Sequence, residues 1–148
     1  MRVDKKSLFL SVGICLLPIL IGVYYYDALP EQISIHFNFK GEPDNFVSKT
    51  RAIIDIPIFL AIVQVIISLV VDFDKTPKKG AFVIKAIIPV IGVLIQGGLI
   101  AYALDNNFNA PQLTVFVIGI LFIILGNYLP KKEFWGKYNF NLFGLEKG

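Results

Sequence analysis

The side chains with the widest chemical range lie together in one short stretch of the chain. His36 is the only histidine, and Glu42 and Asp44 follow it within eight residues. A histidine beside carboxylates can act as a general acid–base pair, as part of a metal site or as a pH-sensitive ligand contact. In a turn, the same carboxylates merely bind a neighbouring group and hold the backbone in shape. The residue types alone leave these uses open.

Metal binding and covalent catalysis find little support in the rest of the sequence. Cys15 is the only cysteine, so no intramolecular disulfide and no Cys/His cluster can form. There is no second histidine and no nucleophile with a base and an orienting group. We therefore predict no metal, no cofactor and no enzymatic activity. An enzyme that uses His36 with Glu42 or Asp44 at the outer surface stays as an alternative.

The composition identifies the class of protein. Of the 148 residues, 55% are hydrophobic and 17% are charged, and the mean hydropathy is +0.69. A soluble domain has about 25% charged residues, and a chain this short cannot hide so many apolar side chains in one core. A soluble enzyme, a disordered chain and a secreted disulfide scaffold are excluded. The net charge of +3 does not predict direct nucleic-acid binding, because in a membrane protein the position of the cations matters more.

Four apolar runs are long enough to cross a bilayer, which takes about 20 helical residues. They are residues 7–26, 52–71, 81–104 and 112–129. The first run ends in three tyrosines rather than in a small-residue cleavage site, so we interpret it as an uncleaved span. The fold class predicted is an all-α integral membrane protein, with residues 1–148 forming a single membrane domain and a four-helix transmembrane bundle.

The positions of the cations predict the orientation of this bundle. Ten of the 14 Lys and Arg residues lie in the N-terminal segment, between the second and third runs, or in the C-terminal segment. Only three lie on the opposite side, and Lys85 lies within a span. The positive-inside rule then places both termini in the cytoplasm of a multi-pass protein of the bacterial cytoplasmic membrane. Residues 27–51 form an external loop, and residues 130–148 a cytoplasmic tail.

The external loop carries a strand pattern. Four apolar residues alternate with four polar ones from residue 33 to residue 40, which is typical of a half-buried strand. Turn-forming residues follow from Gly41, and residues 46–48 can return as a second strand. We predict a β-hairpin-like structure whose apolar face packs on the helix ends, with Phe39 in that face. Ser34, His36, Asn38 and Lys40 would form the polar face, with His36, Asn38 and Lys40 displayed together.

Polar residues inside the spans are candidates for function or for helix packing. We expect Asp55 to meet Lys49, Arg51 or His36 at the outer surface. Lys85 lies too far from Asp55 in depth to pair with it, and we expect it to extend to the cytoplasmic headgroups. Gln64 and Gln96 lie nearer the middle of the bilayer and can hydrogen-bond between helices.

Several short motifs resemble proteins of the SdpI type, which are bacterial membrane immunity proteins against a secreted, cell-killing peptide toxin. The motifs of the loop are Leu29-Pro30, Ile33, His36-Phe37-Asn38, Gly41, Pro43-Asp44 and Ser48-Lys49. A second set is Gly126-Asn127, Pro130-Lys131, Asn141 and Gly144-Leu145. Longer members of that family resemble six-span proteins, whereas four spans are found here.

The resemblance implies immunity to, or sensing of, a hydrophobic antimicrobial peptide by non-covalent binding at the outer face. His36, Asn38, Asp44 and Lys49 are the residues expected to contact the peptide or shape the loop, and Gly41 is expected to be required for the turn. Asp55, within the second span, completes the set of candidates.

The resemblance also implies a cytoplasmic repressor as a partner of the tail. The alternating cations and aromatic rings of residues 130–148 favour contact with membrane lipids instead. An oligomeric transport or scaffold subunit is the alternative function. In that case Gln64, Gln96 and Asp55 would face a common axis formed by several copies.

Overall fold

The computed structural model describes residues 3–73, 78–105 and 107–128. The expected contacts of the tail with lipid or with a repressor lie outside these residues. The described ranges contain four α-helices: α1 (Lys5–Tyr24), α2 (Lys49–Phe73), α3 (Lys78–Leu104) and α4 (Ala110–Tyr128). A short 3₁₀ helix, η1 (Tyr26–Ala28), and two strands, β1 (Gln32–Phe37) and β2 (Pro43–Ser48), connect α1 to α2. The predicted four-helix membrane fold with a hairpin between the first two spans is confirmed.

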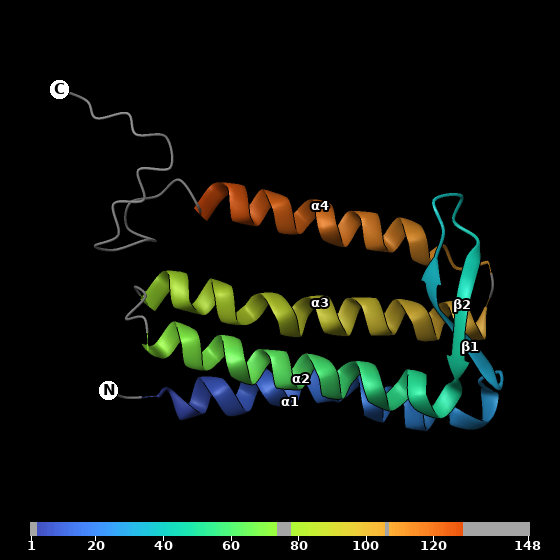
Figure 1. Ribbon diagram of the computed structural model, residues 1–148, viewed down its shortest axis with the longest axis horizontal. Helices are drawn as coiled ribbons and strands as arrows, with labels where there is room; N and C mark the ends of the chain where they lie inside the picture. The colour runs from blue at the N-terminus through green and yellow to red at the C-terminus, as the bar shows by residue number, and fades with distance from the viewer. Residues whose placement is uncertain (1–2, 74–77, 106, 129–148) are drawn as a thin grey trace.

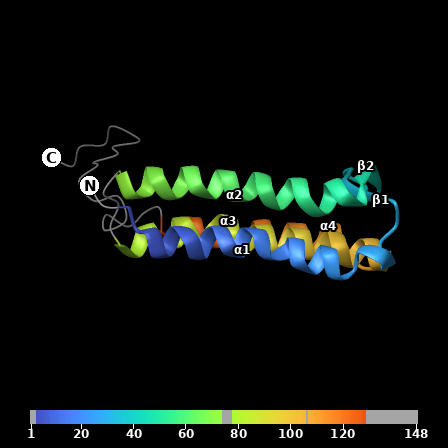
Figure 2. The ribbon, with the colours of Figure 1, turned by 90° about the horizontal axis from the view of Figure 1, so that it is seen from below.

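The helices run side by side, and the hairpin lies across one end of them, opposite the start of α1 (Figure 1). Helices α1, α2 and α3 pack on one another, and α4 packs on α3. The view from below shows α2 lying beside the layer that contains α1 and α3 (Figure 2). The bundle therefore has a three-helix core with α4 added on one side.

Each helix begins two or three residues before the apolar run that predicted it, and α2 also ends later than predicted. Helix α2 begins at Lys49 rather than residue 52 and ends at Phe73 rather than residue 71. Helix α3 begins three residues earlier than predicted, at Lys78. A membrane helix can continue through charged residues near the polar boundary, because its backbone groups are bonded within the helix and long charged side chains reach the headgroups. This extension places Asp72 on α2 rather than in the loop that was expected there.

The hairpin differs from the predicted alternation at two positions. The structure places Phe39 in the turn, fully exposed, rather than on the apolar face. Ser34 was expected on the polar face, yet it is 3% exposed, and its hydroxyl donates to the His36 carbonyl at 2.9 Å. Irregularities in the pairing with β2 on both sides of His36 explain the second difference, because a bulge turns the neighbouring residues to the other face.

A hydrophobic cluster joins the hairpin to the helix ends. Its buried members come from the segment before β1 and from β1, α2 and α3, and they are Leu29, Ile33, Ala52, Ile53 and Ile100. Farther along β1, the ring of Phe37 packs edge-to-face on Tyr102 of α3, with centroids 5.0 Å apart. The hairpin is therefore packed on the bundle instead of extending freely from it.

Candidate functional site

Asn38 organises the turn of the hairpin. Its Oδ1 accepts from the backbone N–H groups of Lys40 (2.9 Å) and Glu42 (3.0 Å), and its Nδ2 donates to Glu42 Oε2 (3.0 Å). The Gly41 N–H donates back to the Asn38 carbonyl, and Gly41 has a φ of 81°. This is the left-handed conformation that favours glycine, as in a type I turn followed by a G1 bulge. Gly41 therefore lies in the predicted turn, in a conformation that few other residues adopt readily.

His36 and Asp44 hold the two strands together near this turn. His36 Nδ1 lies 2.6 Å from Asp44 Oδ1, and their side chains are 65% and 42% exposed. This is the arrangement in which a histidine binds a neighbouring carboxylate and keeps a loop in shape. Across residues 3–73, 78–105 and 107–128, no three His, Cys, Asp or Glu side chains are grouped so that they could hold a metal ion.

Lys49 fixes the other end of the hairpin. Its Nζ lies 3.0 Å from Glu31 Oε1 and 4.6 Å from the centroid of the Tyr26 ring. The Tyr26 hydroxyl is in turn hydrogen-bonded to the Thr50 hydroxyl at 2.7 Å. These contacts join the first turn of α2 to the segments before β1, so the hairpin is fixed at its base as well as at its turn.

Asp55 pairs with Arg51, which is one of the three partners predicted for it. Arg51 Nε donates to Asp55 Oδ2 at 3.0 Å, and both side chains are more than half exposed. Because both residues belong to α2, four positions apart, this pair does not tether the loop to the bundle. An exposed pair of this kind adds only about 0.3–0.5 kcal/mol to stability.

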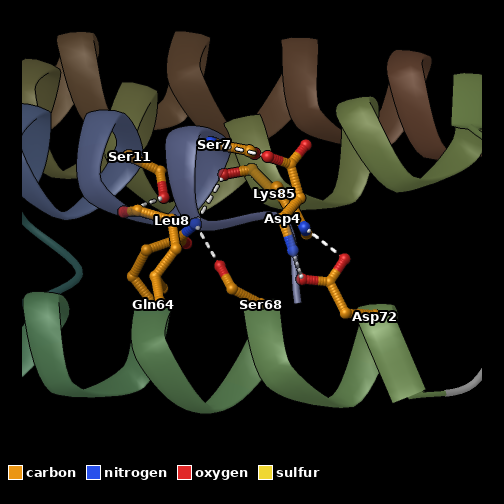
Figure 3. Close-up of polar contacts among 8 residues, drawn as sticks. All are labelled: Asp4, Ser7, Leu8, Ser11, Gln64, Ser68, Asp72 and Lys85. Atoms are coloured by element: carbon orange, nitrogen blue, oxygen red, sulfur yellow. Dashed lines mark hydrogen bonds and ion pairs between the residues drawn. The ribbon is translucent and has the colours of Figure 1, made fainter. Parts of the chain in front are cut away.

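A second polar cluster lies at the opposite end of the bundle, and its ion pair contradicts the prediction for Lys85. Instead of extending to the headgroups, Lys85 is buried, and its Nζ lies 2.5 Å from Asp72 Oδ1. The other Asp72 oxygen accepts the backbone N–H of Asp4, the N-cap of α1, at 3.0 Å. Figure 3 shows these three residues meeting between α1, α2 and α3. Asp72 was predicted to lie in a loop, but it lies in the last turn of α2, where it can pair with Lys85.

Gln64 completes this cluster by satisfying a backbone group that a proline leaves free. Pro89 has no N–H, so the carbonyl of Lys85, four residues earlier, lacks its helical donor. Gln64 Nε2 donates to that carbonyl at 2.9 Å and to the Ser68 hydroxyl at 3.1 Å. Gln64 is fully buried, and within the described part of the chain its Oε1 has no hydrogen-bond partner. The expected hydrogen bond between helices is confirmed here.

Gln96 makes the corresponding contact near the hairpin. Its Nε2 donates to the Ala52 carbonyl at 2.7 Å, which joins α3 to α2, and its side chain is buried. Gln96 lies 11 residues from Lys85 along α3, or about 16 Å. Apolar residues such as Cys15 and Ala61 are buried in the same bundle. Gln64 and Gln96 therefore belong to two separate polar layers of the bundle, and each is bonded within the chain.

The described geometry defines a multi-span membrane protein with a structured hairpin at one end. Residues 13–61 match the model of a family described as a domain of unknown function, DUF1648. The match covers about a third of the chain, from α1 through the hairpin into α2, and it contains all six candidate residues of the loop and α2. No curated protein and no solved structure matches the chain.

Proposed function

We propose that this chain is an SdpI-like membrane protein that gives immunity to, or senses, a secreted hydrophobic antimicrobial peptide. Binding would be non-covalent and would take place on the hairpin. The excess of cations at the other end of the bundle favours a cytoplasmic position for that end, which would put the hairpin outside the cell. The proposal includes a location in the bacterial cytoplasmic membrane with both termini in the cytoplasm.

The hairpin itself carries this proposal. A connection between two neighbouring helices takes only a few residues, whereas this one forms a bulged sheet fixed at its base and its turn. Its tip lies close to the start of α4, since a Cβ atom at Gly41 would be 3.8 Å from Pro111 Cγ. Such a structure covers the helix ends and presents β2 to the surroundings, as strand-adding peptide sites do.

The loop residues that resemble the SdpI type, unlike the second set of motifs, are the residues that build this hairpin. Leu29 and Ile33 are in its core, Asn38 and Gly41 form its turn, and Lys49 fixes its base. The resemblance therefore supports a shared hairpin structure. A shared response to peptides is the functional part of the proposal.

The rival interpretations find less support in these contacts. A transport path would require Gln64, Gln96 and Asp55 to face a common axis. The two glutamines are instead bonded within one copy, and Asp55 is exposed beside Arg51. For an outer-surface enzyme, the bond between His36 Nδ1 and Asp44 is compatible with an acid–base pair, but no contact among the described residues adds a nucleophile to it.

The test is survival of a sensitive bacterial strain that expresses this chain and is treated with the killing peptide that SdpI-type proteins neutralise. We expect protection by the unchanged chain and its loss in Gly41→Val, because a branched residue does not adopt the φ of 81°. Gly13→Ala is the matched control, since nothing lies within 4 Å of a Cβ at Gly13. Killing of cells that carry normal amounts of the unchanged chain in their membrane would refute the proposal.

A further inference from the structure

Among the described residues, β2 pairs only with β1, so its other edge carries backbone groups without a strand partner. The Lys49 N–H donates to the Glu31 carbonyl at 3.0 Å, and Ile33 pairs with Val47 two positions further along. Because bonded and non-bonded pairs alternate in an antiparallel ladder, Phe46 and Ser48 belong to the non-bonded pairs. The backbone N–H and C=O of Phe46 and the N–H of Ser48 therefore point away from β1, whereas the Ser48 carbonyl begins the hydrogen bonding of α2. The side chains of both residues are exposed, with Phe46 at 50%.

The end of the molecule that carries this edge has an excess of negative charge. From residue 26 to residue 55 and from residue 104 to residue 112 there are three cations, Lys40, Lys49 and Arg51, and six acids. The acids are Asp27, Glu31, Glu42, Asp44, Asp55 and Asp105. A surface with this balance attracts positively charged partners and repels negatively charged ones.

Local ion pairs leave half of these acids uncompensated. Glu31 and Asp55 are paired with Lys49 and Arg51, and Asp44 is bonded to His36. Among the residues that the structure describes, Asp27, Glu42 and Asp105 form no ion pair. They belong to η1, to the turn of the hairpin and to the segment after α3, which lie at the same end of the molecule (Figure 1).

We propose that the hairpin binds a cationic, apolar peptide segment, which adds to the free edge of β2 as a third strand. Backbone hydrogen bonds to Phe46 and to the Ser48 N–H would hold the segment, and its apolar side chains would pack on the exposed rings of Phe39 and Phe46. Its basic side chains would face the carboxylates that form no ion pair. The inference rests on the proposed function in that it specifies the chemistry of the peptide.

The experiment measures binding of two synthetic peptides to the full chain in nanodiscs of phosphatidylcholine alone, which carry no net charge. Both peptides are about eight residues long. One alternates lysine and valine, and the other alternates glutamate and valine. We expect the lysine peptide to bind about tenfold more tightly, as a few exposed charge pairs acting together would produce.

Two sets of variants separate charge from strand pairing. The triple variant Asp27→Asn, Glu42→Gln, Asp105→Asn keeps the size of each side chain, and we expect it to lose most of the preference for lysine. Lys40→Gln, which removes a repelling charge, should bind the lysine peptide at least as tightly as the unchanged chain. Ser48→Pro removes the edge N–H and should weaken both peptides several-fold, whereas Ser48→Ala keeps that N–H and should not.

Equal binding of the two peptides, or a preference that survives the triple substitution, would overturn the role of charge. Unchanged binding by Ser48→Pro would overturn strand addition. Survival under peptide killing is measured separately. Charge-selective binding without protection would refute the proposed function alone, and protection without charge selectivity would refute this inference alone.

Discussion

Replacing Asp72 with leucine would leave the Lys85 ammonium in a bundle interior where its side chain is 6% exposed. Lys85 lies seven residues into α3, about 10 Å from the start of the helix. Removing one partner of a buried pair costs about 3–5 kcal/mol, because the other charge is left without compensation. We expect Asp72→Leu to lower the free energy of unfolding by about 3 kcal/mol, near the lower limit because Asp72 lies close to the end of α2.

The opposite substitution is expected to cost less. Lys85→Met leaves the Asp72 carboxylate one residue from the end of α2, where water and the Asp4 N–H are within reach. We expect a loss of about 1–2 kcal/mol, the range for a polar group with incomplete partners. The double variant Asp72→Leu, Lys85→Met removes both charges together and should lose about 1 kcal/mol or less, since apolar replacements of whole pairs are often neutral.

The measurement is unfolding by sodium dodecyl sulfate in mixed micelles, with the unfolded fraction determined by pulse proteolysis. The double-mutant cycle should give a coupling energy of about 3–5 kcal/mol, the sum of the two single losses minus that of the double variant. The exposed pair Arg51 and Asp55 supplies the control cycle, with Arg51→Gln and Asp55→Asn expected to couple by only about 0.3–0.5 kcal/mol. A coupling energy below about 0.5 kcal/mol for Asp72 and Lys85 would refute our interpretation of the buried pair.

Three other substitutions test contacts elsewhere. Gln64→Met should cost about 1–3 kcal/mol in the same unfolding assay, because it leaves the Lys85 carbonyl unpaired. Adding Pro89→Ala to that variant should recover part of the loss, since residue 89 then has an N–H for this carbonyl. No recovery would contradict our view that Pro89 leaves the carbonyl free. Gly22→Ala should cost about 1–3 kcal/mol because the new Cβ would lie 2.6 Å from Ile53 Cγ2, and a neutral result would refute this close packing. Asn38→Ala removes the oxygen that accepts from two backbone N–H groups, so it should raise amide hydrogen exchange in the hairpin with little change in α4. Unchanged exchange would show that the turn does not need this side chain.

The fold was predictable because its main signals are strong and local. Four runs of about 20 apolar residues have few structural solutions in a membrane, and the alternation that begins at Ile33 is typical of a strand. The hairpin was predictable because Gly41 and the residues around it have strong turn preferences. Its exact face was not, because the bulge beside His36 shifts the alternation without a signal in the sequence.

The buried cluster was only half predictable. Gln64 was expected to bond between helices, yet its acceptor is set by the missing N–H of Pro89, and only the packing of α2 on α3 brings the two together. Lys85 was misplaced because the predicted end of α2 put Asp72 in a loop. A boundary error of two residues was enough to hide the pair, since hydropathy reports where apolar residues stop and not where a helix stops.

The packing of β1 on α3 also has a consequence for the order in which the protein assembles. The chain makes α1, the hairpin and α2 first, yet Ile100 and Tyr102, which complete the support of the hairpin, are synthesised about 50 residues or more after its turn. The surface of β1 is therefore only partly covered, by Leu29 and α2, until α3 has inserted. Biogenesis of this protein thus has a vulnerable interval, during which the complete hairpin lacks its support from α3 and is open to incorrect pairing or to proteases.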